Sequence, residues 1–286
     1  MSSFKILTDS CCDLSKQMLA QLEVGVAPLS VDLGGEFFDD GKIPAKEFYD
    51  GMRAGKAPTT SAVNPERWAS LMKPILAEGQ DVLVVAFSSG LSTTYQSAVI
   101  AADELKEQYP ERKILVVDTL AASAGEGLLV WHAAKQRQAG ASLEEVHQWV
   151  VENSPKVAHW VTVDDLKYLK RGGRISATTA VVGTMLSIKP IIHVDNEGKL
   201  DSVAKARGRK ASLNYLVDKI GQTRIPGPND VAFLSHADCL EDAEYIARNV
   251  KEKYGVKEVM ISDIGSVIGS HTGPGCLAFC FLATER

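Results

Sequence analysis

The chain has 286 residues, of which 45% are hydrophobic and 23% are charged, and its formal net charge is −5 at pH 7. This composition is typical of a globular protein with one large or two modest domains. The acidic balance and the lack of Lys or Arg runs argue against a nucleic-acid or anionic-membrane surface.

The chain begins Met-Ser-Ser-Phe-Lys-Ile, which lacks the pattern of a signal peptide. No apolar run approaches the roughly 18 residues of a membrane-spanning helix, so we expect a cytoplasmic protein. The five cysteines form no CxxC pair and are expected to be reduced thiols. The six histidines lack HxxxH and HExxH spacing, so we expect no metal and no cofactor.

The first half of the chain alternates predicted strands and helices. Short apolar runs predict strands over residues 4–7, 81–87 and 113–117, the last two buried in a parallel sheet, and residues 24–33 look extended. Helices are expected over 14–22, 44–54, from 64, over 96–103, from 123, and over 142–153, where Ser142 and Glu145 form a capping box. This order predicts an α/β domain with a mostly parallel sheet layered by helices.

The pattern changes after Ser154-Pro155, which predicts domains over residues 1–154 and 155–286. The second half is expected to be an α+β domain with a mixed or antiparallel sheet. Its predicted strands span 157–163, 231–236, 258–263 and 276–282, with a hairpin of 191–194 and 200–206. Its predicted helices span 164–170, 176–188, 210–221 and 241–254, and residues 268–275 are expected to form a glycine-rich turn.

Three polar loops are candidates for ligand binding. Ser88, Ser89, Ser92 and Thr93 lie between a buried strand and a helix, where the unpaired N–H groups of the helix suit a phosphate or a carboxylate. Helix capping alone explains any one of these hydroxyls. Thr59-Thr60-Ser61 and His271-Thr272 form the other two loops, and all three could converge on one acceptor-rich group if the halves face each other.

Two enzyme hypotheses are weaker. Ser92, Asp118 and His271 can be combined on paper into a hydrolytic triad, but Ser92 lacks the GxSxG elbow. Gly125-Glu-Gly127 lacks the third glycine of a dinucleotide-binding loop.

Two basic segments, 167–174 and 205–210, suit either a solvated surface or a charged partner.

Several stretches together resemble the DegV family of bacterial fatty-acid-binding proteins. They follow one another in order over nearly the whole chain and lie at residues 8–10 with 13–14, 58–61, 88–92 with 94–97, 118–119, 166–176, 188–190 and 271–275. The resemblance implies two α/β domains with a long-chain fatty acid buried between them. It further implies that Thr60, Ser92 and His271 bind the carboxylate, and we add their neighbours Ser61, Thr93 and Thr272 to this site. Thr93 stands where many members have glycine.

The resemblance also implies a partner. Family members present the bound carboxylate to a separate ATP-dependent fatty acid kinase, which makes an acyl phosphate for phospholipid metabolism. Arg174 and Arg207 match positions that serve kinase interaction and phosphoryl transfer. We therefore expect a non-catalytic lipid-binding carrier with at most transient membrane contact, whose tunnel the helix over 176–188 could line. The alternative is an acyl-ester hydrolase or acyltransferase that uses Ser92 or His271.

Overall fold

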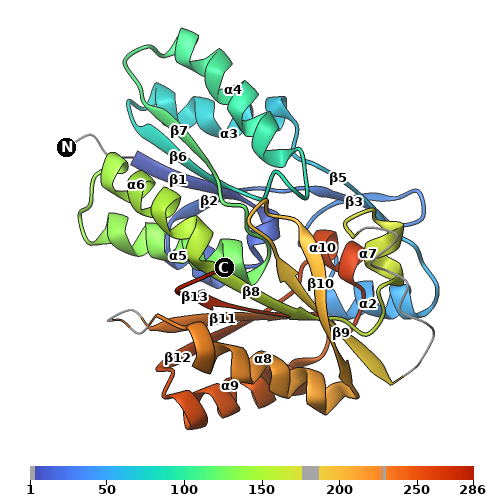
Figure 1. Ribbon diagram of the computed structural model, residues 1–286. Helices are drawn as coiled ribbons and strands as arrows, with labels where there is room; N and C mark the ends of the chain where they lie inside the picture. Colours follow the sequence, from blue (N-terminus) through green and yellow to red (C-terminus); the bar gives the residue numbers. More distant parts are fainter. Residues whose placement is uncertain (1–3, 176–186, 226, 228–229) are drawn as a thin grey trace.

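The computed structural model describes residues 4–175, 187–225, 227 and 230–286, which form three sheets with helices packed between and around them (Figure 1). The predicted helix over 176–188 lies outside the described residues except for its last two positions. Ile188, the last of them, begins a strand instead.

The first sheet is parallel, as the sequence predicts, with the strand order β2-β1-β6-β7. Its strands are β1 (Phe4–Asp9), β2 (Val24–Ala27), β6 (Asp81–Ala86) and β7 (Ile114–Asp118). Every residue of β6 is buried, because helices cover both faces of the sheet. One face carries α3 (Pro65–Ala77) and α4 (Thr94–Gln108), and the other carries α5 (Ala124–Gln138) and α6 (Leu143–Asn153). The capping box of Ser142 and Glu145 is present.

The second sheet is mixed and has the order β10-β9-β8-β13-β11-β12. Its strands are β8 (Val157–Thr162), β9 (Ile188–Val194), β10 (Leu200–Arg207), β11 (Val231–His236), β12 (Glu258–Asp263) and β13 (Leu277–Leu282). Only β11 and β12 pair in parallel, so the prediction of a mixed or antiparallel sheet is confirmed. Helices α8 (Arg209–Thr223) and α9 (Leu240–Tyr254) pack on one face, and α5 packs on the other, so α5 lies between the two large sheets (Figure 1).

The smaller elements correct two expectations. The segment over 56–61, predicted as a loop, contains β5 (Thr59–Ser61), which joins β3 (Ser30–Asp32) and β4 (Phe37–Asp39) in a third, antiparallel sheet. The segment over 268–275, predicted as a turn, contains most of helix α10 (Ser266–Thr272), in which Ser270 and Thr272 donate to the carbonyls four residues earlier. The remaining elements are α1 (Lys16–Gln21), α2 (Ala45–Arg53), α7 (Lys167–Arg171) and the 3-10 turns η1 (Ser10–Cys12) and η2 (Ser154–Lys156).

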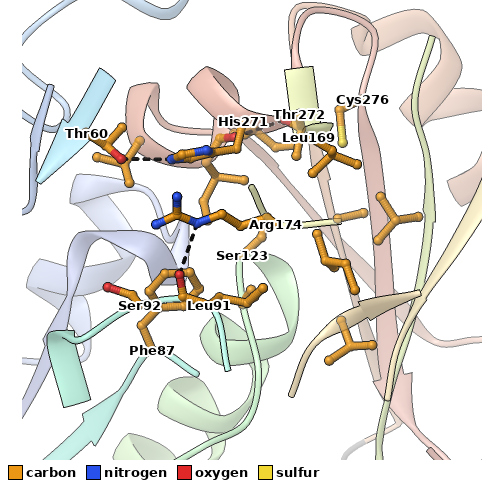
Figure 2. Close-up of a pocket in the computed structure, with 18 of the residues that line it drawn as sticks. Thr60, Phe87, Leu91, Ser92, Ser123, Leu169, Arg174, His271, Thr272 and Cys276 are labelled. Carbon is orange, nitrogen blue, oxygen red and sulfur yellow. Dashed lines mark hydrogen bonds between the residues drawn. The ribbon is translucent and has the colours of Figure 1, made fainter. Parts of the chain in front are cut away.

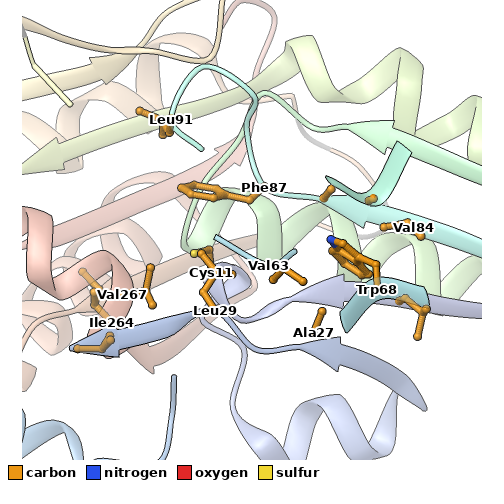
Figure 3. Packing of buried hydrophobic residues seen from close by; sticks show 14 of the residues in the cluster. Cys11, Ala27, Leu29, Val63, Trp68, Val84, Phe87, Leu91, Ile264 and Val267 are labelled. Carbon is orange, nitrogen blue, oxygen red and sulfur yellow. The ribbon is translucent and has the colours of Figure 1, made fainter. Parts of the chain in front are cut away.

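One hydrophobic cluster runs from the core of the first half to the middle of the molecule (Figure 3). Trp68 and Val84 lie at one end of it, between α3 and the parallel sheet. Phe87 and Leu91, which follow β6, lie near the other end with Val267 of α10. The loops at the carboxyl end of the parallel sheet are therefore held by the same core as the sheet.

Buried carboxyl groups connect the elements beneath these loops. Asp9 accepts hydrogen bonds from the backbone N–H groups of Cys11 (3.0 Å) and Phe87 (2.9 Å), which ties the end of β1 to the end of β6. Asp13 accepts from the Ser123 hydroxyl (2.5 Å) and from the Gly265 N–H (2.8 Å), which ties the first half of the chain to the second. Burial raises the pKa of Asp9 to about 7 and raises the pKa of Asp13 well above its usual value.

This shift predicts a pH dependence of stability. A carboxyl group whose pKa is higher in the folded than in the unfolded chain stabilises the fold at low pH, and this contribution is lost as the pH rises through the folded pKa. For Asp9 that window extends from the ordinary value of 3.8 to about 7. We expect the free energy of unfolding, measured by urea denaturation, to fall between about pH 4 and about pH 7 and to fall less steeply in Asp9→Asn. Asp201→Asn, at an exposed position of β10, should keep the wild-type slope; an unchanged slope in Asp9→Asn would contradict the assignment.

Candidate functional site

A cavity of about 460 Å³ lies where the two halves of the chain meet (Figure 2). Its volume is within the range of small-molecule binding sites. Most of the residues that line it come from β5, the loops after β6 and β7, strands β8, β9 and β10, helix α7 and the turn after it, α10, and the start of β13. The cavity thus includes the carboxyl end of β6, where open α/β sheets bind ligands.

Most of the cavity wall is apolar. Val161 of β8 and Ile192 and Val194 of β9 point to the same side of their sheet, because side chains alternate along a strand. The larger hydrophobic side chains of the wall are Leu29, Phe87, Leu91, Val161, Leu169, Ile192, Val194, Leu200, Ile264, Val267 and Ile268. Such a wall suits a hydrocarbon chain and gives no hydrogen-bonding partners along most of its surface.

Polar side chains gather at one side of the cavity in Figure 2. Thr60 Oγ1 lies 2.8 Å from His271 Nε2, at hydrogen-bonding distance. Ser92 Oγ lies 2.9 Å from Thr94 Oγ1 and accepts from the Thr94 N–H at 3.2 Å. Arg174 donates from Nε to the Leu91 carbonyl at 3.2 Å. We call Thr60, Ser92, Arg174 and His271 the polar end of the cavity.

His271 is a neutral imidazole at physiological pH. Burial, together with the positive charges of Arg174 and Arg171, lowers its pKa to about 4. The ring packs directly on the backbone of Gly172, where a Cβ would overlap Nδ1. His271 can therefore give or accept a hydrogen bond at this end of the cavity but supplies no charge.

The other predicted site residues divide into two groups. Thr93 and Thr272 also line the cavity, and the Thr272 hydroxyl donates to the Ile268 carbonyl at 3.1 Å. Ser61 is exposed on the opposite face of β5 from Thr60 and does not line the cavity. Arg207 is exposed on β10, whereas Arg174 points into the cavity.

Ser92, Asp118 and His271, the hypothetical hydrolytic triad, are not connected to one another by any hydrogen bond between described residues. Ser92 pairs with Thr94, and His271 pairs with Thr60. The Asp118 carboxylate accepts from the backbone N–H groups of Ser89 and Leu120, both at 3.1 Å. Each member thus has a different partner, and the geometry does not favour the hydrolytic alternative.

Sequence reasoning missed two features of the site. The first is the apolar wall of β8 and β9, whose alternating residues carry a detectable period-two signal. The second is His159, which is 1% exposed, lines the cavity and accepts from the Ala122 N–H at 3.4 Å. A lone histidine inside an apolar strand gives no signal that could have assigned it to the cavity.

Over residues 4–175, 187–225, 227 and 230–286, no group of His, Cys, Asp and Glu side chains is arranged to hold a metal ion. Within the same ranges, every helix is too short or too polar to cross a membrane.

The contact between Gly172 and His271 generates a prediction. A methyl group at position 172 would displace the imidazole ring from its buried position, so we expect Gly172→Ala to move the pKa of His271 from about 4 towards its ordinary value of 6.5. NMR titration of the His271 ring measures this. Gly173→Ala is the matched control, because Gly173 has a positive φ of 69° but no atom near its Cβ position. It should cost stability and leave the His271 pKa unchanged; an unchanged pKa in Gly172→Ala would refute the contact.

Comparison with known proteins gives consistent matches along the chain. The family described as "Uncharacterised protein, DegV family" matches residues 3–284. A DegV domain-containing protein of Clostridium perfringens is 46% identical over 290 residues, which cover 100% of this chain and 99% of the relative. A solved structure described as "Fatty Acid Binding of a DegV family Protein from Thermus thermophilus" is 33% identical, with a TM-score of 0.87 and coverage of 99% and 100%. A stearic-acid-binding protein from Eubacterium ventriosum is 26% identical, with a TM-score of 0.87 and 98% of both chains covered.

Proposed function

The chain belongs to the DegV family, and we propose that it binds a long-chain fatty acid in the cavity and acts as a carrier, without catalysing a reaction itself. The observation that supports this proposal most is the division of the cavity into an apolar wall and one polar end. A fatty acid has the same division. The solved relatives from Thermus thermophilus and Eubacterium ventriosum are described as binding fatty acids.

The two parts of the cavity would contribute differently to binding. Each methylene group buried against the apolar wall contributes about 0.8 kcal/mol, so chain burial would supply most of the affinity. Thr60, Ser92 and His271 would donate hydrogen bonds to the carboxylate, with Thr93 and Thr272 beside them. The Ser61 side chain lies on the opposite face of β5, so it could join them only if the strand were rotated about its own axis.

We further propose that the carrier is cytoplasmic and presents the carboxylate to a separate ATP-dependent fatty acid kinase for phospholipid metabolism. Lys167, Lys170 and Arg171 of α7 are exposed, and α7 packs against α10, which carries His271. A basic surface beside the polar end would suit a partner that brings a nucleotide triphosphate to the carboxylate. Arg174, at the polar end of the cavity, and the exposed Arg207 are the two candidates for kinase interaction and phosphoryl transfer.

In this proposal the domains over residues 1–154 and 155–286 hold the ligand at their interface. The lining residues support this division, since Thr60 and Ser92 come from the first part and Val161 and His271 come from the second. Helix α5 belongs to the first part but packs on β11 and β13 of the second. The two parts therefore share a core beside the cavity.

The first test is mass spectrometry of an organic extract of the purified protein, with measured stoichiometry. We expect near-equimolar fatty acid. After delipidation, Thr60→Ala should bind palmitate roughly 10-fold more weakly, because one hydrogen bond to a charged group is lost. Ser61→Ala is the matched control on the same strand and should bind as the wild type does. The carrier proposal fails if the wild type neither co-purifies with a fatty acid nor binds one after delipidation.

A second test concerns the kinase. Arg207→Ala should leave palmitate affinity unchanged and lower the rate at which a DegV-partner fatty acid kinase makes acyl phosphate from the loaded carrier, because an exposed cation acts on the partner and not on the cavity. Asp201→Ala, at another exposed position on β10, should lower neither quantity. A parallel loss of binding and phosphorylation in Arg207→Ala would contradict the assigned role.

A further inference from the structure

The turn of the hairpin formed by β9 and β10 reaches from the second sheet to the loops at the end of the first (Figure 1). The Ser88 hydroxyl, directly after β6, donates to the Gly198 carbonyl of this turn at 2.8 Å. Ser88 is fully buried, and its Oγ also accepts from the Gly90 N–H at 3.1 Å. Ser88 does not line the cavity, so ligand contact does not account for this hydroxyl of the first polar loop.

The backbones at this contact lie too close for a side chain on either side. A Cβ at Gly198 would overlap Ser88 Oγ and lie 3.0 Å from Leu120 Cα. A Cβ at Gly90 would lie 2.6 Å from the Glu197 carbonyl oxygen and 2.8 Å from that of Gly198. Gly198 is buried although exposed residues flank it, and it has a positive φ of 73°. Two glycines, one from each half of the chain, therefore permit the close contact.

Hydrogen bonds within the turn make it a stiff unit. Asp195 Oδ1 accepts from the N–H groups of Glu197 and Lys199, both at 2.9 Å. The Asp195 N–H donates to the Lys199 carbonyl at 2.9 Å, and the Gly198 N–H donates to the Asp195 carbonyl at 3.0 Å. An aspartate that binds the backbone in this way fixes the shape of a turn. A displacement at Gly198 is therefore passed on to the strands that the turn joins.

These strands carry part of the apolar wall of the cavity. Val194 and Leu200 lie directly opposite each other across the hairpin, one on each side of the turn, and both line the cavity. Directly opposite residues lie on the same face of a sheet and pack against each other. β10 is the outermost strand of its sheet and pairs only with β9. The docked turn therefore helps to fix the position of Val194 and Leu200 relative to the first half of the chain.

We propose that Ser88 is a positioning residue for the lipid: through Gly198 it holds Val194 and Leu200 against the hydrocarbon chain and makes the cavity selective for unbranched chains. The inference rests on the proposed function and deepens it by naming the shape of chain that the cavity accepts. A wall held in place excludes added methyl groups, because a close-packed interior cannot take extra volume without a shift of its surroundings.

The test compares palmitate with phytanate, which has the same main-chain length and head group but carries methyl branches. Both are titrated into delipidated protein. The wild type should prefer palmitate, and Gly198→Ala should reduce this preference by about 5- to 10-fold, because the new methyl group pushes the turn away from Ser88. Gly208→Ala is the matched control. Gly208 follows β10 and also has a positive φ, of 85°, but no atom lies near its Cβ position, so the preference should stay as in the wild type.

A second pair of variants removes the hydrogen bond without adding bulk. Ser88→Ala should reduce the palmitate preference by about 3-fold, because the hairpin loses one polar contact with the first half. Ser154→Ala is its control, since Ser154 is a buried serine of η2 that donates to the Val150 carbonyl at 2.7 Å and does not line the cavity. It should lower stability and leave the preference unchanged. Gly90→Ala perturbs the contact from the opposite side and should act as Gly198→Ala does.

NMR separates positioning from a general loss of structure. The methyl groups of Val194 and Leu200 are labelled, and their contacts with the chain of bound palmitate are measured. These contacts should weaken in Gly198→Ala and persist in Gly208→Ala. A variant that is merely less stable would keep them in its folded fraction.

Each outcome decides one of the two proposals. If the wild type binds neither palmitate nor phytanate, the proposed function fails and the positioning role fails with it. If the wild type binds palmitate but Gly198→Ala and Gly90→Ala keep the wild-type ratio of the two affinities, the fatty-acid proposal stands and the role of Ser88 is overturned. A wild type that binds both lipids equally well, or a variant that loses both affinities equally, also overturns that role.

Discussion

Helix α5 packs between the two large sheets, and the rest of the structure depends on this close contact. A Cβ at Gly125 would overlap the His159 ring, and a Cβ at Gly127 would approach the Cys12 carbonyl to 2.5 Å. The helix can be covered on both sides only because its first turn lacks these side chains. Ser123, just before the helix, lines the cavity and hydrogen bonds to Asp13 and Ser235. The spacing of the two halves, and with it the width of the cavity, therefore depends on Gly125 and Gly127, which do not line the cavity.

The elements that could be predicted from sequence are those with strong local signals. The Val-rich run of β6, the capping box of Ser142 and the hairpin of β9 and β10 all follow from short stretches of chain. Strand β5 could not be predicted in this way, because Thr59–Ser61 is polar and becomes a strand only by pairing with β3. Helix α10 could not be predicted because it is rich in Gly and Ser, which favour turns. In the structure the hydroxyls of Ser270 and Thr272 donate to helix carbonyls four residues earlier, which makes these residues compatible with the helix.

The difference between local signals and long-range pairing also explains how much of the candidate site could be predicted. The three polar loops were identifiable from their residue types, and the structure brings Thr60, Ser92 and His271 to one cavity. The direction of each side chain was not identifiable. Ser61 faces away because β5 alternates, and Arg174 faces inward because a Schellman motif turns the chain after α7. Both facts depend on backbone geometry that residue types do not reveal.

At the polar end of the cavity, one residue offers hydrogen bonds without charge and another carries a charge, and both depend on the segment at the end of α7. His271 is neutral and rests on the backbone of Gly172, while Arg174 carries the charge two residues later. Lys170, on the preceding turn, is exposed. A displacement of α7 by a partner bound at its exposed face would therefore move the support of the imidazole and the guanidinium together. In a carrier of the kind proposed, such a shared support would let one contact with a partner change the surroundings of the head group while the apolar wall keeps the hydrocarbon chain in place.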